Sequence, residues 1–378
     1  MDPVLTFIDD HEAEILALWR EITQIESPSN HKPGVDAVAK RLAAFCEEKL
    51  GWYTRVREDP VYGKCLAVCS CPFEEYQNGI ALSAHMDTVH SLGSFQPLLR
   101  EDEEYLYGPG AGDCKGGIML CLLTAWTLKE MGYCKRPIKL LFAGDEESGG
   151  PSGGDFYPKE LAGSDFMFNA ESGIRGKLVT GRKASIIAVF EIQGVPAHIG
   201  YLTDKPKSAI REAAMKLLAL EDASDYEDLT FCGGTIQGGS IATSVPGACR
   251  LEVNVRIRTQ EAAKRAMDIL KVQAETCYVP GTGCTLTVRG NADPMEQREA
   301  NLDLCRLFSE TARELGYEGF EPAFVGGASD ASYAAAMGIP VVCATGPVVD
   351  FQHTLNERTL KASMAQRTKI HVKTIHKL

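Results

Sequence analysis

Two helical hydrophobic patterns open the chain. Apolar residues recur at helical spacing over residues 4–26 and 35–50, which predicts two amphipathic helices. Short continuous apolar runs follow and are typical of buried strands, with one long enough for a buried helix. These runs span residues 80–84, 118–128 (the helix), 138–143 and 166–168. Apolar strands that alternate with helices indicate an α/β sheet covered on both faces.

The pattern changes near residue 182. A strand, a helix, two strands, a helix and a strand are predicted over residues 185–193, 208–220, 229–236, 249–258, 261–274 and 285–289. This β-α-β-β-α-β order is the ferredoxin-like pattern. Helices and a strand then resume over residues 302–315, 329–337 and 339–344. The sequence therefore predicts a ferredoxin-like domain, residues 182–291, inserted into a first domain made of residues 1–181 and 292–378.

The composition of the 378 residues, 44% hydrophobic and 24% charged, is that of a globular protein. No apolar run reaches the roughly 20 residues that a bilayer-spanning helix needs. The net charge of −12, without a dense Lys/Arg cluster, disfavours nucleic acid and anionic lipid as partners. The amino terminus lacks the basic segment and apolar core of a secretion signal. Together with thirteen scattered cysteines, which fit reduced thiols, this predicts a cytoplasmic protein.

The first chemically informative segment, His85-Met86-Asp87, comes directly after a predicted strand. Residues i and i+2 of an extended segment point to the same side, so His85 and Asp87 would face the same space. A metal-binding imidazole commonly has a carboxylate partner that fixes its tautomer, and Asp87 could supply it. For this pair taken alone, the alternative is a histidine that only completes a strand end.

A glycine-rich loop, residues 107–117, precedes the predicted buried helix. Asp113 would lie at the amino terminus of that helix, where the helix dipole favours an ionised carboxylate. Gly108, Gly110 and Gly112 suggest a phosphate-binding loop. However, their spacing matches neither common nucleotide fingerprint, and no clear strand directly precedes them. Asp113 is therefore a candidate ligand, with an ordinary helix cap as the alternative.

Three consecutive acidic residues, Asp145, Glu146 and Glu147, follow the predicted strand 138–143. Crowded like charges are unfavourable unless a cation compensates them or they lie in open solvent. Because neighbouring side chains diverge in an extended segment, Glu147 could bind a metal while Glu146 addresses a water beside it. A solvated loop is the alternative.

Glu171 and His353 each follow a strand-like stretch, and neither is informative alone. Together, the candidate ligands comprise two imidazoles and three carboxylates: His85, Asp113, Glu147, Glu171 and His353. This donor set suits two Zn²⁺ ions per subunit that share one carboxylate. Two such ions about 3.5–4 Å apart can activate a water and polarise a carbonyl. Glu146 then remains available as a general base.

These segments resemble the motifs of the dinuclear-zinc peptidase and amidohydrolase family of clan MH. That family includes glutamate carboxypeptidases, dipeptidases, aminoacylases and succinyl-diaminopimelate desuccinylases. The similar stretches occur in the family's order across nearly the whole chain. They are His85–Val89, Gly108–Gly110, Asp113–Gly117, Asp145–Gly149, Glu171–Ser172, Ala197–Gly200, Gly326–Ala331 and His353. The resemblance is closest to the glutamate-carboxypeptidase-like branch.

The resemblance implies a zinc-peptidase-like catalytic domain with a mixed sheet between helices. The inserted domain would be the family's lid and dimerisation domain. One zinc would be held by His85, Asp113 and Glu171. The other would be held by Asp113, Glu147 and His353.

Catalytic roles are implied in the same way. Asp87 would orient His85, and Glu146 would deprotonate the attacking water and later protonate the leaving amine. A cis peptide bond would follow Asp113. His198 resembles the histidine that stabilises the oxyanion, in many members across a dimer interface. A homodimer through the inserted domain is therefore expected.

Substrate contacts are implied as well. Arg256 matches an arginine that grips the free carboxylate of the substrate, with Arg258 as the alternative. Gly327 lies in a matching glycine motif and is a candidate substrate contact. Thr243 stands where the family usually has an asparagine that contacts substrate. The segment Lys205–Ser208 departs from the family's Pro-x-x-Gly.

The expected function is zinc-dependent hydrolysis of an amide bond next to a free carboxylate in small peptides, of carboxypeptidase or dipeptidase type. An aminoacylase or deacylase that acts on N-acyl amino acids is the alternative. A non-catalytic metal- or peptide-binding protein on this scaffold would have lost a ligand or Glu146, and neither is lost. A cysteine hydrolase built on Cys114 and a histidine is the remaining rival.

Overall fold

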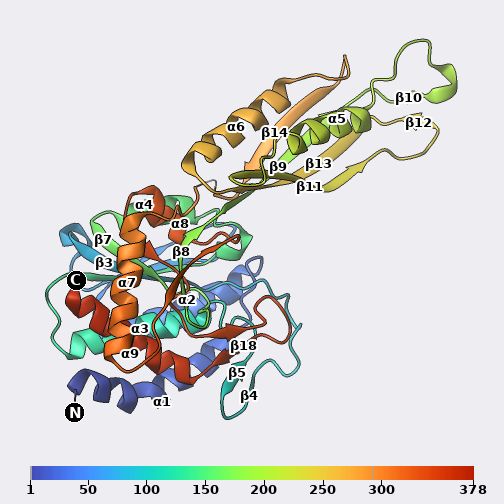
Figure 1. Ribbon diagram of the computed structural model, residues 1–378. Coiled ribbons are helices and arrows are strands. Elements are labelled where there is room, and N and C mark those ends of the chain that lie inside the picture. Colours follow the sequence, from blue (N-terminus) through green and yellow to red (C-terminus); the bar gives the residue numbers. More distant parts are fainter. Residues whose placement is uncertain (1, 292) are drawn as a thin grey trace. The chain divides into compact units, whose positions relative to one another are not determined.

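The computed structural model describes residues 2–291 and 293–378 and divides the chain into two compact units (Figure 1). Unit 1 comprises the residues up to Gly181 together with Gln297–Val325 and Ser329–Leu378. Unit 2 comprises Arg182–Glu296 and Gly326–Ala328. Unit 2 thus starts at the predicted residue 182 and runs past the predicted limit 291. The first residue expected after that limit, residue 292, lies outside the described residues.

A six-stranded mixed sheet forms the centre of unit 1, in the order β1-β2-β6-β3-β7-β16. Its strands are β1 (Tyr53–Arg57), β2 (Cys65–Cys69), β3 (Gly79–His85), β6 (Ile138–Ala143), β7 (Ser164–Asn169) and β16 (Val341–Val342). The pairs β3–β6, β3–β7 and β7–β16 are parallel, whereas β2 pairs antiparallel with β6 and β1 antiparallel with β2. The expected mixed α/β sheet is confirmed.

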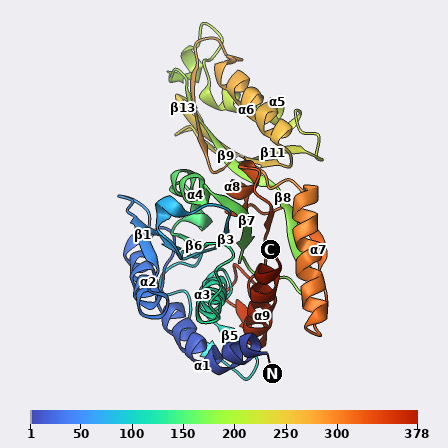
Figure 2. The same cartoon turned by 90° about the vertical axis from the view of Figure 1, so that its left-hand side faces the viewer.

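Helices of unit 1 pack around this sheet (Figure 2). They are α1 (Pro3–Thr23), α2 (Lys32–Phe45), α3 (Lys115–Glu130), α4 (Gly153–Leu161), α7 (Glu299–Glu314), α8 (Ala331–Ala336) and α9 (Ala362–Lys377). Alternate residues of β3, namely Ile80, Leu82 and Ala84, join one core cluster with side chains of α1, α2, α3, α7 and α9. The intervening strand position His85 therefore points away from that cluster.

Short elements complete unit 1. A second sheet has the order β17-β18-β5-β4, formed by β17 (Val349–Asp350), β18 (Arg358–Leu360), β5 (Tyr105–Tyr107) and β4 (Arg100–Glu101). A third pairs β8 (Lys177–Arg182) with β15 (Glu321–Val325). Single turns are η1 (Cys46–Leu50), η2 (Phe73–Glu75) and η3 (Glu146–Ser148). Because β5 ends directly before Gly108, the expectation that no strand precedes the glycine-rich loop is wrong.

Unit 2 is a four-stranded antiparallel sheet in the order β11-β13-β9-β14 with two helices. The elements run β9 (Ala184–Gln193), α5 (Ala209–Glu221), β11 (Leu229–Gly238), β13 (Ala248–Ile257), α6 (Gln260–Glu275) and β14 (Gly283–Arg289). A turn, η4 (Ile199–Tyr201), and a small β10 (Ala197–His198) to β12 (Ser244–Val245) ladder lie between them. Unit 2 therefore has the β-α-β-β-α-β order and a core of its own.

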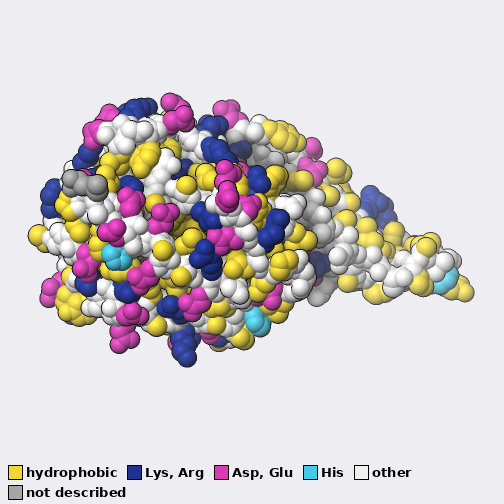
Figure 3. Space-filling model, turned by 90° about the horizontal axis from the view of Figure 1, so that it is seen from below, with side chains coloured by type: hydrophobic (Ala, Val, Ile, Leu, Met, Phe, Trp, Pro, Cys, Tyr) yellow, Lys and Arg dark blue, Asp and Glu magenta, His cyan; other side chains and the backbone are white. Residues whose placement is uncertain are grey.

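None of the helices in the described ranges combines the length and apolarity required to cross a bilayer. On the face drawn in Figure 3, acidic and basic side chains are interspersed among apolar ones.

Candidate active site

Three of the expected ligands, and the expected base Glu146, come from neighbouring strand ends. His85 is the last residue of β3, Glu146 and Glu147 form η3 just after β6, and Glu171 follows β7. Since β3, β6 and β7 are parallel neighbours, their carboxyl ends meet at one edge of the sheet. The sheet topology therefore places these side chains together.

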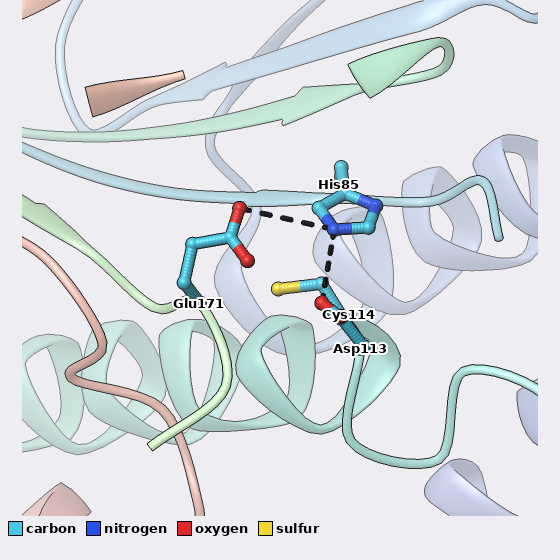
Figure 4. A group of neighbouring side chains, drawn as sticks. All are labelled: His85, Asp113, Cys114 and Glu171. Carbon is cyan, nitrogen blue, oxygen red and sulfur yellow. Dashed lines mark ion pairs between the residues drawn. The ribbon is translucent and has the colours of Figure 1, made fainter. Parts of the chain in front are cut away.

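The first ligand group contains His85, Asp113 and Glu171, with the thiol of Cys114 beside them (Figure 4). His85 Nε2 lies 3.4 Å from Asp113 Oδ1 and 3.8 Å from Glu171 Oε1. Donor atoms that bind one zinc at about 2.0–2.2 Å in tetrahedral geometry are about 3.3–3.6 Å apart. The side chains are thus spaced as ligands of a single ion would be.

The second group contains Asp113, Glu147 and His353. His353 Nε2 lies 3.1 Å from Asp113 Oδ2 and 3.5 Å from Glu147 Oε1. Asp113 therefore faces one imidazole with each carboxylate oxygen, which is the geometry of a ligand shared by two ions. Although burial alone would raise it, hydrogen bonds to His353 and His85 keep the pKa of Asp113 far below its usual value.

His353 reaches this position from an unusual backbone conformation. Its φ of 61° lies in the left-handed region, which non-glycine residues seldom adopt. Its imidazole is about half exposed, and the adjacent carboxylates of Asp113 and Glu147 raise its pKa to about 10. Such conformations cluster at functional sites because the surrounding structure must hold them.

Asp87 contacts both His85 and the backbone of the two glutamates. Its Oδ1 accepts the Glu146 N–H at 3.1 Å, and its Oδ2 accepts the Glu147 N–H at 3.0 Å and the Ser29 hydroxyl at 2.6 Å. His85 Nδ1 lies 3.0 Å from the Asp87 carbonyl oxygen and 3.3 Å from its Oδ1. This buried carboxylate and its own carbonyl therefore orient His85 and fix the backbone of both glutamates.

The acidic segment is not a solvated loop. Asp145 is fully buried, and its Oδ2 accepts hydrogen bonds from the Ser152 N–H and hydroxyl. Glu147 Oε1 is buried and accepts no hydrogen bond from any described residue. Burial, with the charge of Glu171 adding to it, raises the pKa of Glu146 well above its usual value. Buried carboxylates in this density need a compensating cation, so the residues present fit a metal site.

The thiol of Cys114 makes a hydrogen bond with the backbone. Its Sγ donates to the Ala170 carbonyl at 3.2 Å, and burial together with Glu171 raises its pKa well above the usual value. A buried, protonated thiol is a poor nucleophile, which disfavours the cysteine-hydrolase alternative. The peptide bond between Asp113 and Cys114 is cis, as the resemblance implied.

The sequence predictions omitted several buried polar residues behind the ligands. Glu357 is fully buried, with His90 Nε2 2.8 Å from its Oε2. Lys115 donates to the Ile25 and Pro109 carbonyls, and burial lowers its pKa to about 7. The interval of four residues between His353 and Glu357 was the only sequence signal for Glu357.

The remaining expected site residues belong to unit 2. His198 is exposed, and its Nδ1 accepts the Gly200 N–H at 3.1 Å. Its neighbour Ile199 donates its N–H to the carbonyl of Thr243 at 3.2 Å. The β10–β12 ladder, in which His198 pairs with Ser244, therefore places His198 and Thr243 close together.

Two arginines of unit 2 hold the glycine segment 326–328. Arg256 Nη1 donates to the Gly326 carbonyl at 3.2 Å, and Arg182 Nη1 to the Gly327 carbonyl at 3.0 Å. Arg256 Nε also donates to Asn254 Oδ1. Arg258 lies 3.8 Å from Glu227 in an exposed ion pair. A guanidinium has five N–H donors, so Arg256 retains donors for a further partner.

Comparison with known proteins identifies a family that this chain matches. Residues 81–377 match the family described as peptidase family M20/M25/M40. The chain is 28% identical over 352 residues to carboxypeptidase G2 of Pseudomonas sp. strain RS-16, which covers 89% of this chain and 82% of that protein. It is 28% identical over 297 residues to succinyl-diaminopimelate desuccinylase of Wolinella succinogenes, covering 73% and 78%.

Solved structures share the fold. A metallo-carboxypeptidase of the M20 family from Sulfolobus solfataricus superposes with a TM-score of 0.76 at 16% identity, covering 96% of this chain and 98% of that one. Because the family match spans most of the sequence, the chain belongs to peptidase family M20/M25/M40. It is a hydrolase of this metal-dependent family.

Proposed function

We propose that this protein is a two-zinc peptidase that cleaves an amide bond next to a free carboxylate in small peptides, of carboxypeptidase or dipeptidase type. The observation that carries the proposal is the shared carboxylate of Asp113. Its two oxygens face two separate imidazoles, each accompanied by a further glutamate. Glu146 forms a further close group with His85 and Glu147, one residue of each ligand group, and is left over once each ion has its three expected ligands.

The residues present would hold two ions. His85, Asp113 and Glu171 would bind one Zn²⁺, and Asp113, Glu147 and His353 the other, with three carboxylates and two imidazoles as donors. When bound, such a pair of ions polarises the scissile carbonyl and lowers the pKa of water.

The chain's own residues would carry the proton and align the site. Glu146 would accept a proton from the attacking water and pass it to the leaving amine, a role that suits a carboxylate with a raised pKa. Asp87 would keep His85 in the tautomer whose Nε2 is free to bind metal, because Nδ1 faces the Asp87 oxygens.

Substrate recognition is assigned to unit 2. His198 would stabilise the oxyanion, and Arg256, or else Arg258, would bind the free carboxylate of the substrate. Gly327 and Thr243 would contact the substrate backbone. Unit 2 would act as the lid and as the contact surface of a homodimer. Sedimentation of the purified protein at several concentrations tests the dimer, and a concentration-independent monomer contradicts it.

The reduced thiols support a cytoplasmic location. All thirteen cysteines are free, and most of them are buried. A reducing compartment keeps such thiols from pairing.

The main alternative is deacylation of N-acyl amino acids, and the named relatives include both a carboxypeptidase and a desuccinylase. A panel of dipeptides, acidic-terminated peptides and N-acyl amino acids, assayed with zinc and with chelator, separates the two. Higher kcat/KM for N-acyl amino acids than for every peptide would favour the deacylase. Loss of activity under thiol alkylation but not chelation would contradict both.

The catalytic assignment is tested by Glu146→Gln. The amide cannot accept the proton, so kcat should fall by about 10²–10⁴-fold while zinc content stays at two ions per subunit. Elemental analysis and steady-state kinetics measure the two quantities. Glu74→Gln, an exposed glutamate in the η2 turn, is the matched control and should behave as wild type. Turnover retained by Glu146→Gln would remove this residue from the base role.

A further inference from the structure

A buried carboxylate lies directly behind the backbone of Asp113. Glu357 Oε1 accepts the Gly112 N–H at 3.1 Å and the Asp113 N–H at 3.2 Å. Its other oxygen, Oε2, lies 2.8 Å from His90 Nε2. The side chain of Glu357 is completely inaccessible to solvent, and that of His90 nearly so. Among these partners only Asp113 is an expected metal ligand, and Glu357 contacts its backbone N–H, not its carboxylate.

The local fold fixes this carboxylate in place. Glu357 immediately precedes β18, whose Arg358 and Thr359 pair with Tyr107 and Leu106 of β5. Strand β5 leads directly into the glycine-rich loop that carries Asp113. The ladder therefore sets the register between Glu357 and the loop.

The loop has little room to move. A side chain at Gly112 would overlap with Val349 and Thr359 of the neighbouring strands. Close packing on one side and two hydrogen bonds to Glu357 on the other hold the backbone of residues 112–113.

Residues 353–357 therefore contact Asp113 at both its carboxylate and its backbone N–H. His353 Nε2 lies 3.1 Å from its carboxylate, and Glu357, four residues later, accepts a hydrogen bond from its backbone N–H. Glu357 thus fixes the backbone from which the Asp113 side chain projects, and His353 faces the carboxylate at its other end, so both the position and the rotation of this side chain are constrained. A shared ligand needs both, because each of its oxygens must face a different ion.

We propose that Glu357, oriented by His90, is a positioning residue that presents the Asp113 carboxylate to both metal ions at once. This inference rests on the proposed two-zinc function. Glu357 touches neither ion nor substrate and acts through the Gly112 and Asp113 amides. Its loss should therefore weaken both ions in parallel, whereas loss of a ligand that belongs to one group should weaken mainly one.

The test is a metal titration of the full-length apoprotein with Co²⁺, followed by its visible absorption, and with Zn²⁺ against a chromophoric chelator. Glu357→Ala should weaken the affinity for both ions by about 10–100-fold. Glu357→Gln keeps an oxygen for the two N–H groups and should stay within a few-fold of wild type. His353→Ala should weaken one ion much more than the other.

A matched control exists in unit 2. Glu212 is also buried, accepts the N–H groups of Tyr278 and Val279, and pairs with a cation, Lys216. Glu212→Ala should lower stability while leaving metal affinity unchanged, which separates positioning of the metal site from general support of the fold. If Glu357→Ala does not fold, Glu357→Asp replaces it in the metal titrations. This variant retains the charge, but its side chain is one methylene shorter.

The outcomes are distinct. Parallel weakening of both ions, rescued by glutamine, supports the proposal. Wild-type affinity in Glu357→Ala or Glu357→Asp, or weakening of one ion alone, overturns it. A wild-type protein that takes up fewer than two ions contradicts the proposed function instead, whatever the Glu357 variants do.

Discussion

A single histidine outside the expected ligand set illustrates how burial decides chemistry at the residue scale. His371 of α9 is fully buried, with its ring packed against Phe168 and Phe308. Its Nδ1 lies 2.8 Å from the Arg367 carbonyl, and its Nε2 has no hydrogen-bond partner among the described residues. Burial lowers the pKa of His371 to about 3. The imidazole is therefore neutral in the folded protein at every pH at which the enzyme would work.

This residue predicts a pH dependence of stability. The unfolded chain binds a proton at His371 below about pH 6.5, but the folded chain does so only near pH 3. Stability from this group is thus complete above pH 6.5 and is lost as the pH falls towards 3. Between pH 7 and 5 the loss should be about 2 kcal/mol. Urea unfolding at both pH values should show this extra loss in wild type but not in His371→Gln.

The control for this experiment is His11. Its Nδ1 makes the same contact, 2.8 Å to the carbonyl four residues earlier on α1, but it is only partly buried. His11→Gln should keep the pH dependence of wild type. An equal pH dependence in wild type and His371→Gln would show that the buried imidazole does not contribute.

At the scale of elements, the contact between α3 and the segment after β7 determines where Glu171 lies. Gly117, in the first turn of α3, packs so closely that a Cβ there would overlap with the Ala170 carbonyl. Gly117→Ala should therefore destabilise the protein by about 1–3 kcal/mol, although alanine favours helix. Because Ala170 adjoins Glu171, zinc affinity should fall too. Thermal unfolding and zinc titration measure the two effects.

A second helix glycine provides the comparison. Gly154 in α4 is exposed, and a Cβ added there would meet no other atom within 4 Å. Gly154→Ala should leave stability unchanged or raise it by up to about 1 kcal/mol through helix propensity. Destabilisation of equal size at Gly154 and Gly117 would show that packing on Ala170 is not the cause.

Most elements with a strong hydrophobic pattern could be predicted from the sequence, although the short, fully buried strand β2 was missed, and weakly patterned ones could not. The buried helix predicted at 118–128 and the strand predicted at 80–84 correspond to α3 and β3. Strand β1 was not predicted, because it is half exposed and its residues are mostly polar. Helix α4 was missed since it starts in a glycine-rich segment and contains Pro158, both of which oppose helix.

The residues of the candidate site likewise divide into those that a local sequence pattern predicts and those that it does not. His85 and the acids 145–147 follow apolar strands, so their position at the sheet edge could be predicted from order alone. Glu357 could not, because its partners Gly112 and Asp113 lie about 245 residues earlier and no local pattern encodes that pairing. Tertiary contacts of this kind depend on strand register, here the β18–β5 ladder, which sequence periodicity does not specify.

At the scale of the whole molecule, the two units have separate apolar cores. The buried cluster of unit 1 contains residues of its sheet and of five helices, whereas that of unit 2 contains β9, β11, β13, α5 and α6. The expected metal ligands all belong to unit 1. Metal binding should therefore stabilise one unit selectively.

Metal removal tests this directly. A ligand present at a thousand times its Kd stabilises the state that binds it by about 4 kcal/mol. Hydrogen exchange with zinc should thus be slower than with chelator in segments 85–90, 108–117 and 145–150, where buried carboxylates otherwise repel one another. Strands β9 and β13 of unit 2 serve as the internal control and should exchange equally in both conditions.

Magnesium, which prefers all-oxygen ligands, should protect far less than zinc. Equal protection of both units by zinc would contradict selective stabilisation, and no protection anywhere would contradict the metal site itself, since a bound ion must slow the opening of the backbone that carries its ligands.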